Sequence, residues 1–495
     1  TLYSYDAVGD ETGAPYYVIY NLSQSADGKT VTWMSNPVHS AARAVARISA
    51  SADMTGAAEV EGESRLISYS SSKQINRVNA VSLTGLEAGA TYYYQVGDGS
   101  VWSEVRSFTV PAAEKQTRFF LLADIQEEAA LEGMGRIANH LAGQYPFGVQ
   151  LGDAVDNVRY YNQWEDALSL FTLDGIRNTD MIHVIGNHEA DDGGNNAIAA
   201  KSVFGVPAAW YSVERGDVYI AVLNHTSDKD TLQQFTQWLG EDAARSTCTW
   251  KVLGTHVPAY YTNPTGGGET YVQYLPAACD AAGIDFYFSG NDHSYARTMV
   301  LKNGQPVSEA AQNGRLPATY GKGVLYYICG DLGEKSRSTE YKAVNNPDFH
   351  FAQVSQEYDS LYLAVEATAD AMTVRTYSVS AEGAQSLLDT YTMRVPASVC
   401  RDKGHDFSGD TVYVRDGKLV CSFCGQTVEL KDSGYTGWAR DEATGLRMYS
   451  YHNAWHTGWF IIDPEVYCFD KSGIAYDGRV TLYGKQFVFD DGVVV

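Results

Sequence analysis

The tetrapeptide Gly186-Asn187-His188-Glu189 constrains the fold more than any other stretch, because it directly follows the apolar residues 181–185. A short apolar run that ends at turn residues predicts a buried strand. An amide, an imidazole and a carboxylate therefore stand at the carboxyl end of a strand, where ligands and catalytic groups collect in open α/β sheets. Taken alone, the tetrapeptide is equally compatible with a simple strand-to-loop turn.

Four other apolar segments end in the same way, in residues that bind hard or borderline metal ions. Buried carboxylates and imidazoles are costly unless they are paired or bound to a metal. Five such strand ends therefore favour a common metal-binding edge over five unrelated turns. The four segments, each with its terminal motif, are residues 118–123 before Asp124, residues 147–151 before Gly152-Asp153, residues 250–255 before His256, and residues 284–289 before Gly290-Asn291-Asp292-His293.

In this order, the five motifs resemble those of the calcineurin-like metallophosphoesterase superfamily, and within it the bacterial members of the purple acid phosphatase group. The resemblance covers about residues 115–396. It implies two mixed sheets packed face to face with helices outside, an αββα domain. It also implies a metal-dependent phosphoric ester hydrolase whose substrate is a small phosphorylated molecule.

The resemblance also implies a set of metal ligands. Asp124, Asp153 and His293 would hold a first metal ion, and Asp153, Asn187 and His256 a second. A bridging carboxylate such as Asp153 suits the ~3.5–4 Å metal separation of two-metal phosphoryl chemistry. A hydroxide held on the metals would attack phosphorus, and His188 would act as general acid or as a hydrogen-bond donor to the transition state. Iron, zinc and manganese are the metals expected.

Three positions depart from the family pattern. Asp156 replaces the tyrosine ligand that gives purple acid phosphatases their colour, so no purple colour is expected. Gln126 stands where many metallophosphoesterases have a histidine, and either Gln126 or Asp156 is a candidate to complete the first site. Asn291 replaces a histidine ligand of the second metal. An amide oxygen binds zinc or iron more weakly than an imidazole does, so this ion is expected to be loosely held or to be a harder ion such as manganese or magnesium.

The length, net charge and apolar content of the chain exclude some classes of function. The chain has 495 residues, too many for one core, so several domains are expected. A net charge of -24 argues against nucleic acid as a partner, because basic surfaces carry that binding. No apolar run is long enough to span a bilayer. The sequence starts at Thr1 rather than methionine, which is compatible with a processed or trimmed N-terminus. The protein is expected to be secreted or displayed on a Gram-positive-type cell surface, as the resemblance of its C-terminal repeats implies.

The predicted fold class is multidomain α+β. Residues 1–114 carry short alternating strands such as residues 91–96, which predict a β-sandwich. Part of this region resembles the fibronectin type III-like module that precedes the catalytic domain in purple acid phosphatases. Residues 115–396 alternate strands with helical stretches at residues 127–140, 232–239 and 271–282.

The remaining chain is predicted to form a small β-rich region. Residues 397–430 contain a Cys-x4-His followed by a Cys-x2-Cys, a pattern compatible with a structural zinc site or with a hairpin whose thiols bind nothing. Residues 431–495 repeat aromatic motifs at a period near twenty and resemble degenerate cell-wall-binding repeats. These would stack on cell-wall carbohydrate, or would be a packed hairpin stack without a ligand. The four candidate zinc ligands are Cys400, His405, Cys421 and Cys424.

The sequence therefore predicts a secreted or surface phosphatase that hydrolyses phosphomonoesters through two metal ions. A phosphodiesterase is the alternative within enzymes. The alternative from another class is a surface binding protein with a decayed catalytic site, which Asn291 favours. The sequence identifies no substrate-binding residues.

Overall fold

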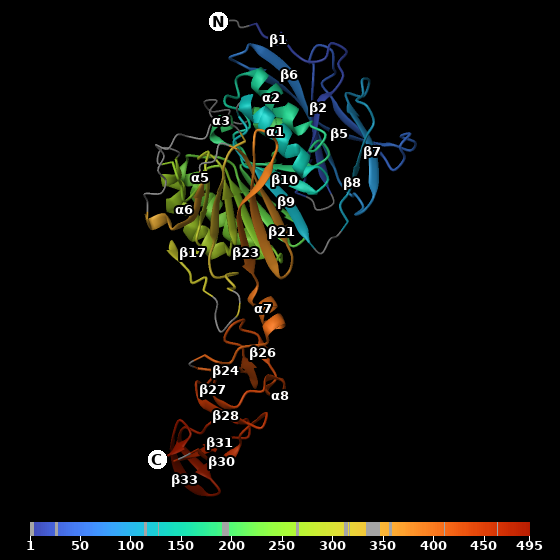
Figure 1. The fold of residues 1–495 in the computed structure, drawn as a ribbon. Helices are drawn as coiled ribbons and strands as arrows, with labels where there is room; N and C mark the ends of the chain where they lie inside the picture. The colour runs from blue at the N-terminus through green and yellow to red at the C-terminus, as the bar shows by residue number, and fades with distance from the viewer. Residues whose placement is uncertain are drawn as a thin grey trace. The chain divides into compact units, whose positions relative to one another are not determined.

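The computed structural model describes residues 4–24, 28–112, 116–126, 128–190, 198–263, 267–310, 315, 317–332, 347–355, 359–409, 411–462 and 464–495 (Figure 1). Contacts within the chain divide it into two compact units. The first unit comprises residues 1–309 and 319–393, and the second comprises residues 310–318 and 394–495. A short segment from within the predicted catalytic range thus belongs to the second unit.

The first sheet of the catalytic region is built on three parallel strands, β9 (Thr117–Leu122), β10 (Phe147–Gln150) and β11 (Asp180–His183). Their side chains are almost all buried, as expected for parallel strands covered on both faces. Antiparallel strands β21 (Ser360–Ala367), β22 (Ala371–Val379) and β23 (Gln385–Arg394) extend the sheet beyond β9.

The second sheet places the later motifs opposite the first. Its central strands β13, β14, β15 and β19 are parallel. Gly254 in this sheet faces Leu151 and Val184 beside the first sheet, so the two sheets pack against each other. The strand order is β12 (Trp210–Arg215), β13 (Val218–Leu223), β14 (Trp250–Thr255), β15 (Phe286–Ser289), β19 (Leu325–Cys329), β16 (Tyr295–Thr298) and β20 (Phe351–Ser355).

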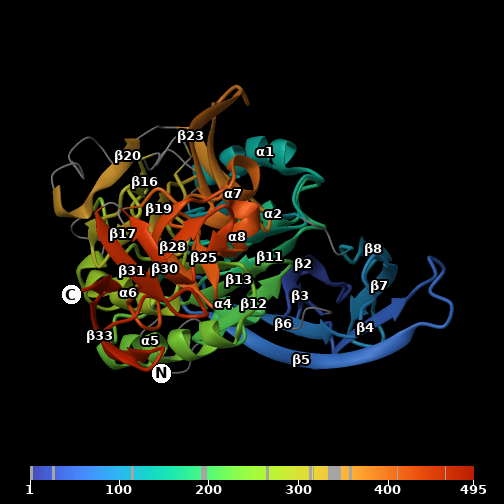
Figure 2. The same cartoon turned by 90° about the horizontal axis from the view of Figure 1, so that it is seen from below.

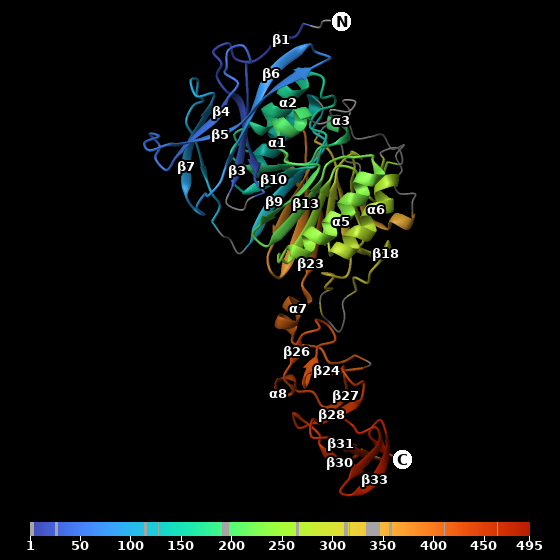
Figure 3. The ribbon, with the colours of Figure 1, turned by 180° about the vertical axis from the view of Figure 1, so that it is seen from behind.

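Helices cover the outer faces of both sheets. Helix α1 (Glu128–Leu141) contacts β21 and β22 of the first sheet. Helices α5 (Lys229–Arg245) and α6 (Gly268–Ala282) lie side by side on the second sheet (Figure 3). Leu232, Phe235, Leu239 and Leu275 of these helices join one buried cluster with β13 and β14. The predicted αββα layering and the three predicted helices are confirmed.

The N-terminal region consists of strands, as predicted. Strand β5 (Ala58–Tyr69) is long enough to pair with two neighbours, with β4 (Ala44–Ser49) through its first half and with β6 (Gln74–Leu83) through its second (Figure 2). Aromatic side chains such as Trp33, Tyr20 and Phe108 fill the core. The other strands of this region are β1 (Asp6–Ala7), β2 (Tyr16–Leu22), β3 (Lys29–Ser35), β7 (Thr91–Gly97) and β8 (Arg106–Thr109).

The N-terminal strands belong to the same sheet as the catalytic strands β9, β10 and β11. Strand β2 pairs in parallel with β11, with Asn21 opposite Met181. A buried ion pair between Lys29 and Asp180 closes the same junction. The N-terminal region is therefore joined to the strand that leads directly into Gly186 and Asn187.

The second unit contains two small sheets. Strands β24 (Tyr413–Arg415) to β29 (Ala454–Trp455) form the first, and β30 (Gly458–Ile462) to β34 (Val493–Val494) form the second. The repeated Gly-Trp motifs open hairpin strands in each sheet, and Trp438 packs 4.8 Å from Tyr467, measured between ring centroids. None of the helices in the described ranges is long and apolar enough to cross a membrane.

Candidate metal centre

The predicted metal ligands all lie just past strand ends, and the backbone there is unusual. Asp124 follows β9, Asp153 follows β10, and His293 follows β15. These three residues have positive φ angles of 53°, 55° and 50°. Residues other than glycine rarely adopt this backbone conformation, because it is strained. Strained residues of this kind concentrate at functional sites, where the surrounding structure holds them in place.

The folded chain brings the predicted ligands together. Ligand atoms of Asp124, Asp153 and His256 all lie within 4.8 Å of one another. His256 Nε2 is 3.1 Å from Asp153 Oδ2 and 4.0 Å from Asp124 Oδ1. His293 Nε2 is 3.5 Å from Asp124 Oδ1. All four side chains are buried.

The charges of this cluster fit a bound cation. His256 Nδ1 lies 2.8 Å from the Leu151 carbonyl oxygen, which can only accept, so Nδ1 carries a proton and Nε2 faces the two carboxylates. Burial alone would lower the pKa of His256, but the facing Asp153 carboxylate outweighs burial and raises it. Burial raises the pKa of Asp124. Two buried carboxylates call for positive charge, which the imidazole supplies when it is protonated and which a metal ion supplies when it binds.

Two further predicted ligands have buried polar atoms that no other described residue satisfies. Asn187 Oδ1 is buried without a hydrogen-bond partner, and so are both amide atoms of Gln126. Buried polar atoms are normally paired, so unpaired oxygens beside carboxylates are consistent with metal ligation. The roles of Asn187 and Gln126 as ligands stay predictions.

At the other two departures from the family pattern, Asn291 and Asp156, the side chains have other partners. The Asn291 backbone N–H donates to both oxygens of Asp124, at 3.0 and 2.9 Å, and its side-chain amide donates to Asp292 Oδ1. The exposed carboxylate of Asp156 lies 3.5 Å from His188 Nδ1. Asn291 therefore positions Asp124 through its backbone, and ligation by Asn291 or Asp156 stays a prediction.

Glu189 has a structural role that the sequence did not reveal, although it belongs to the tetrapeptide Gly186–Glu189. Its buried carboxylate accepts backbone N–H groups from Gly186 (2.7 Å), Asp153 (3.0 Å), Ala154 (2.5 Å) and Val155 (3.0 Å). The loop that carries Asp153 is thus tied to the loop that carries Asn187. Burial raises the pKa of Glu189 to about 7.

Asp331 is a second residue whose role the sequence did not reveal. It follows the buried strand β19, as the predicted ligands follow the ends of their own strands. Its Oδ2 lies 3.2 Å from His293 Nδ1. A carboxylate on the far nitrogen fixes the tautomer and the ring plane of a ligating histidine and raises its basicity. Asp331 is therefore a positioning residue for His293.

Replacing Asp331 with asparagine is expected to weaken metal binding or activity about 10- to 100-fold, as for other such partners of ligating histidines. Metal titration of the apo-protein and steady-state kinetics with added metal would measure both effects. Unchanged affinity and activity in Asp331→Asn would show that packing alone orients His293.

Two motif glycines leave room for the ligands. A Cβ on Gly152 would lie 2.5 Å from the His256 ring, and Gly152 also has a φ of +97°. A Cβ on Gly290 would lie 2.6 Å from Asp124 Oδ2. Both distances are too short for a Cβ atom, so glycine at these positions leaves room for the side chains of His256 and Asp124.

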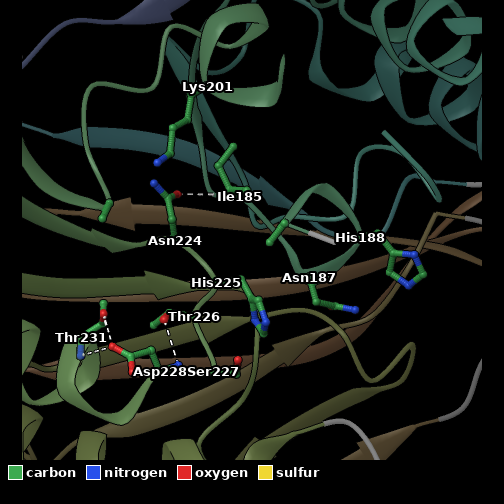
Figure 4. A pocket seen from close by; sticks show the side chains of 12 residues that line it. Ile185, Asn187, His188, Lys201, Asn224, His225, Thr226, Ser227, Asp228 and Thr231 are labelled. Atoms are coloured by element: carbon green, nitrogen blue, oxygen red, sulfur yellow. Dashed lines mark hydrogen bonds between the residues drawn. The ribbon is translucent and has the colours of Figure 1, made fainter. Parts of the chain in front are cut away.

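A pocket of about 610 Å³ opens beside the cluster (Figure 4). Asn187, His188 and His225 line one side of it, and Lys201 extends into it from α4 (Ile198–Val203). His225 had no assigned role in the sequence. The pocket gives a small molecule access to His188, whose Nε2 is 3.7 Å from Asp153 Oδ2.

Comparison with known protein families agrees with this geometry. Residues 15–110 match the purple acid phosphatase N-terminal domain, and residues 117–295 match the calcineurin-like phosphoesterase family. Among solved structures, the purple acid phosphatase from yellow lupin (Lupinus luteus) seeds is similar with a TM-score of 0.61, at 15% identity over 77% of this chain and 74% of that chain. At this identity the likeness shows the fold.

Curated relatives are plant phosphatases. The phosphoenolpyruvate phosphatase of Allium cepa is 23% identical over 57% of this chain and 63% of its own length. The Fe(3+)-Zn(2+) purple acid phosphatase 12 of Arabidopsis thaliana is 25% identical over 50% of this chain and 57% of its own. The match thus spans less than two thirds of these relatives. The chain contains a purple acid phosphatase N-terminal domain followed by a calcineurin-like metallophosphoesterase domain.

Proposed function

We propose that the protein hydrolyses phosphomonoesters at a centre of two metal ions. The observation that carries this proposal is the placement of Asp153, whose carboxylate faces His256 and His188 while Asp124 lies in the same cluster. Carboxylate, amide and imidazole donors suit zinc, iron or manganese. When bound, such ions polarise the phosphoryl oxygens and activate water at neutral pH.

His188 is placed to deliver a proton to the leaving group. Its Nδ1 lies 2.7 Å from the Asp156 carbonyl oxygen, which can only accept, so Nδ1 carries a proton. Nε2 then points toward Asp153 and the pocket, and it can donate when the ring is protonated. Its backbone N–H donates to Asp153 Oδ1 at 3.1 Å, which holds the His188 backbone beside the metal cluster. A general acid must lie within reach of the departing oxygen, and the proposal places that oxygen in the pocket next to Nε2.

The pocket beyond His188 is suited to the rest of an anionic substrate. Lys201 is the one lysine or arginine among the described residues that line it. In a chain with a net charge of -24, a cation at this point attracts a phosphorylated molecule locally. Export from the cell and carbohydrate binding by the C-terminal repeats are further predictions from the sequence.

The test is hydrolysis of an aryl phosphate monoester by the full chain. Activity is expected to disappear on chelation and to return when zinc, iron, manganese or magnesium is restored singly. A bis-aryl phosphate diester, assayed in parallel, distinguishes the phosphodiesterase alternative. Turnover of the diester alone would replace the monoesterase proposal, and no turnover with either substrate and any ion would favour a binding protein built on this fold.

A further inference from the structure

The second unit contains a group of metal-binding side chains far along the sequence from the catalytic motifs. Cys400 lies in α7 (Pro396–Lys403), and His405 follows that helix after Gly404. Cys421 and Cys424 lie in the turn between β25 (Lys418–Val420) and β26 (Thr427–Val428). One ligand atom from each of the four side chains lies within 4.8 Å of the other three. We propose that these four residues bind one structural zinc ion.

The distances agree with a tetrahedral zinc site. With Zn–S bonds of about 2.3 Å and Zn–N bonds of about 2.0–2.1 Å, tetrahedral ligands stand about 3.8 Å apart for two sulfurs and about 3.6 Å apart for sulfur and nitrogen. Cys400 Sγ and Cys421 Sγ are 3.7 Å apart, and Cys424 Sγ is 3.4 Å from His405 Nδ1. The two sulfurs are too far apart for a disulfide, and all three cysteines are free.

The local backbone is folded around the sulfurs. The Asp406 N–H donates to Cys421 Sγ at 3.2 Å, a contact that stabilises a thiolate. The Gly425 N–H donates to the Cys421 carbonyl oxygen, which closes the Cys-x2-Cys turn. Cys400 and Cys421 are buried. Three thiols and an imidazole that converge in this way satisfy one another poorly as hydrogen-bond partners, whereas a zinc ion satisfies all four after the thiols lose their protons.

Arg315 lies beside this group and is paired with the carboxylate of Asp406. Zinc with three thiolates and a neutral histidine would carry one net negative charge. The Arg315 guanidinium donates to the Gly404 carbonyl oxygen at 2.8 Å and lies 3.6 Å from Asp406 Oδ2. The ion would therefore link α7 to the β25–β26 turn, next to Arg315.

The test counts zinc in the full chain, with the catalytic cluster disabled by Asp153→Ala together with His256→Ala, which removes the carboxylate shared by both proposed metal ions and a further ligand. After purification under reducing conditions with zinc supplied, elemental analysis is expected to find one zinc per chain. Cys421→Ser and Cys424→Ser in this background are expected to lose it. Cys248→Ser, which removes a partly exposed thiol of the first unit, is the matched control and is expected to keep it.

Cobalt substitution keeps the test decisive if a serine variant fails to fold. Co(II) in this site is expected to give intense visible bands and sulfur-to-cobalt charge transfer, and His405→Cys is expected to retain one ion and to strengthen the charge-transfer band. Absence of zinc from the folded Asp153→Ala, His256→Ala double variant, iron in its place, or cobalt spectra without thiolate bands would overturn the proposal. Phosphatase activity enters none of these readouts, so failure of the proposed enzymatic function would leave the result intact.

Discussion

Asp153→Ala is expected to reduce kcat/KM for an aryl phosphate monoester by at least about 10³-fold, because metal-ion catalysis of this kind is worth several kcal/mol of transition-state stabilisation. The Asp153 carboxylate contacts two parts of the site. Its Oδ1 accepts the His188 N–H at 3.1 Å, and its Oδ2 lies 3.1 Å from His256 Nε2. Loss of this carboxylate would remove the ligand that the two proposed metal ions share, together with its hydrogen bond from the His188 N–H.

Metal analysis accompanies the kinetics for this variant. Asp153→Ala is expected to bind less catalytic metal than the wild type, while the zinc proposed for the second unit stays. Asp174→Ala removes a carboxylate that is 93% exposed after α2 (Tyr161–Phe171), and it is the control for loss of negative charge. Retention of wild-type turnover by Asp153→Ala would contradict the proposed function and favour the binding-protein alternative.

His188→Ala is expected to lower kcat by about 10²–10⁴-fold, the usual contribution of general acid–base catalysis, while metal content stays at the wild-type level. His188 Nε2 faces the pocket and is 3.7 Å from Asp153 Oδ2. Asp124, Asp153 and His256 lie close together through their own ligand atoms, so the cluster does not depend on the His188 side chain. The loss therefore falls on the chemical step rather than on assembly of the site.

Leaving-group dependence distinguishes an acid from a residue that only binds. An alkyl phosphate needs a proton on its departing oxygen more than an activated aryl phosphate does, so His188→Ala is expected to harm the alkyl substrate more. His225→Ala, a change in the same pocket, is expected to leave this difference between substrates unaltered. Equal losses for both substrates in His188→Ala would assign His188 to binding the transition state through hydrogen bonds.

The strand ends could be predicted because they follow from local patterns, whereas the αββα layers were implied by the family resemblance and not by spacing. An apolar run that stops at Gly, Asp or His marks the buried strand and its end, as at β9, β10, β11, β14 and β15. The helical periodicity of residues 127–140 likewise predicted α1. The spacing of Cys421 and Cys424 also indicated a metal-binding turn, because a Cys-x2-Cys pair is local to one turn of the chain.

Only the tertiary structure revealed the contacts that hold these residues in place. Glu189 ties the Asp153 loop, and Asp331 meets His293, through hydrogen bonds between segments that are 34 to 38 residues apart in the chain. The pairing of β2 with β11 and the grouping of residues 310–318 with the second unit are also contacts between distant segments. Periodicity and spacing in the sequence indicate the position of a residue within its own strand or turn. The partner across a loop or sheet is fixed by packing of the whole chain, so the sequence determined which residues could bind metal, and the fold decided which residues hold them in position.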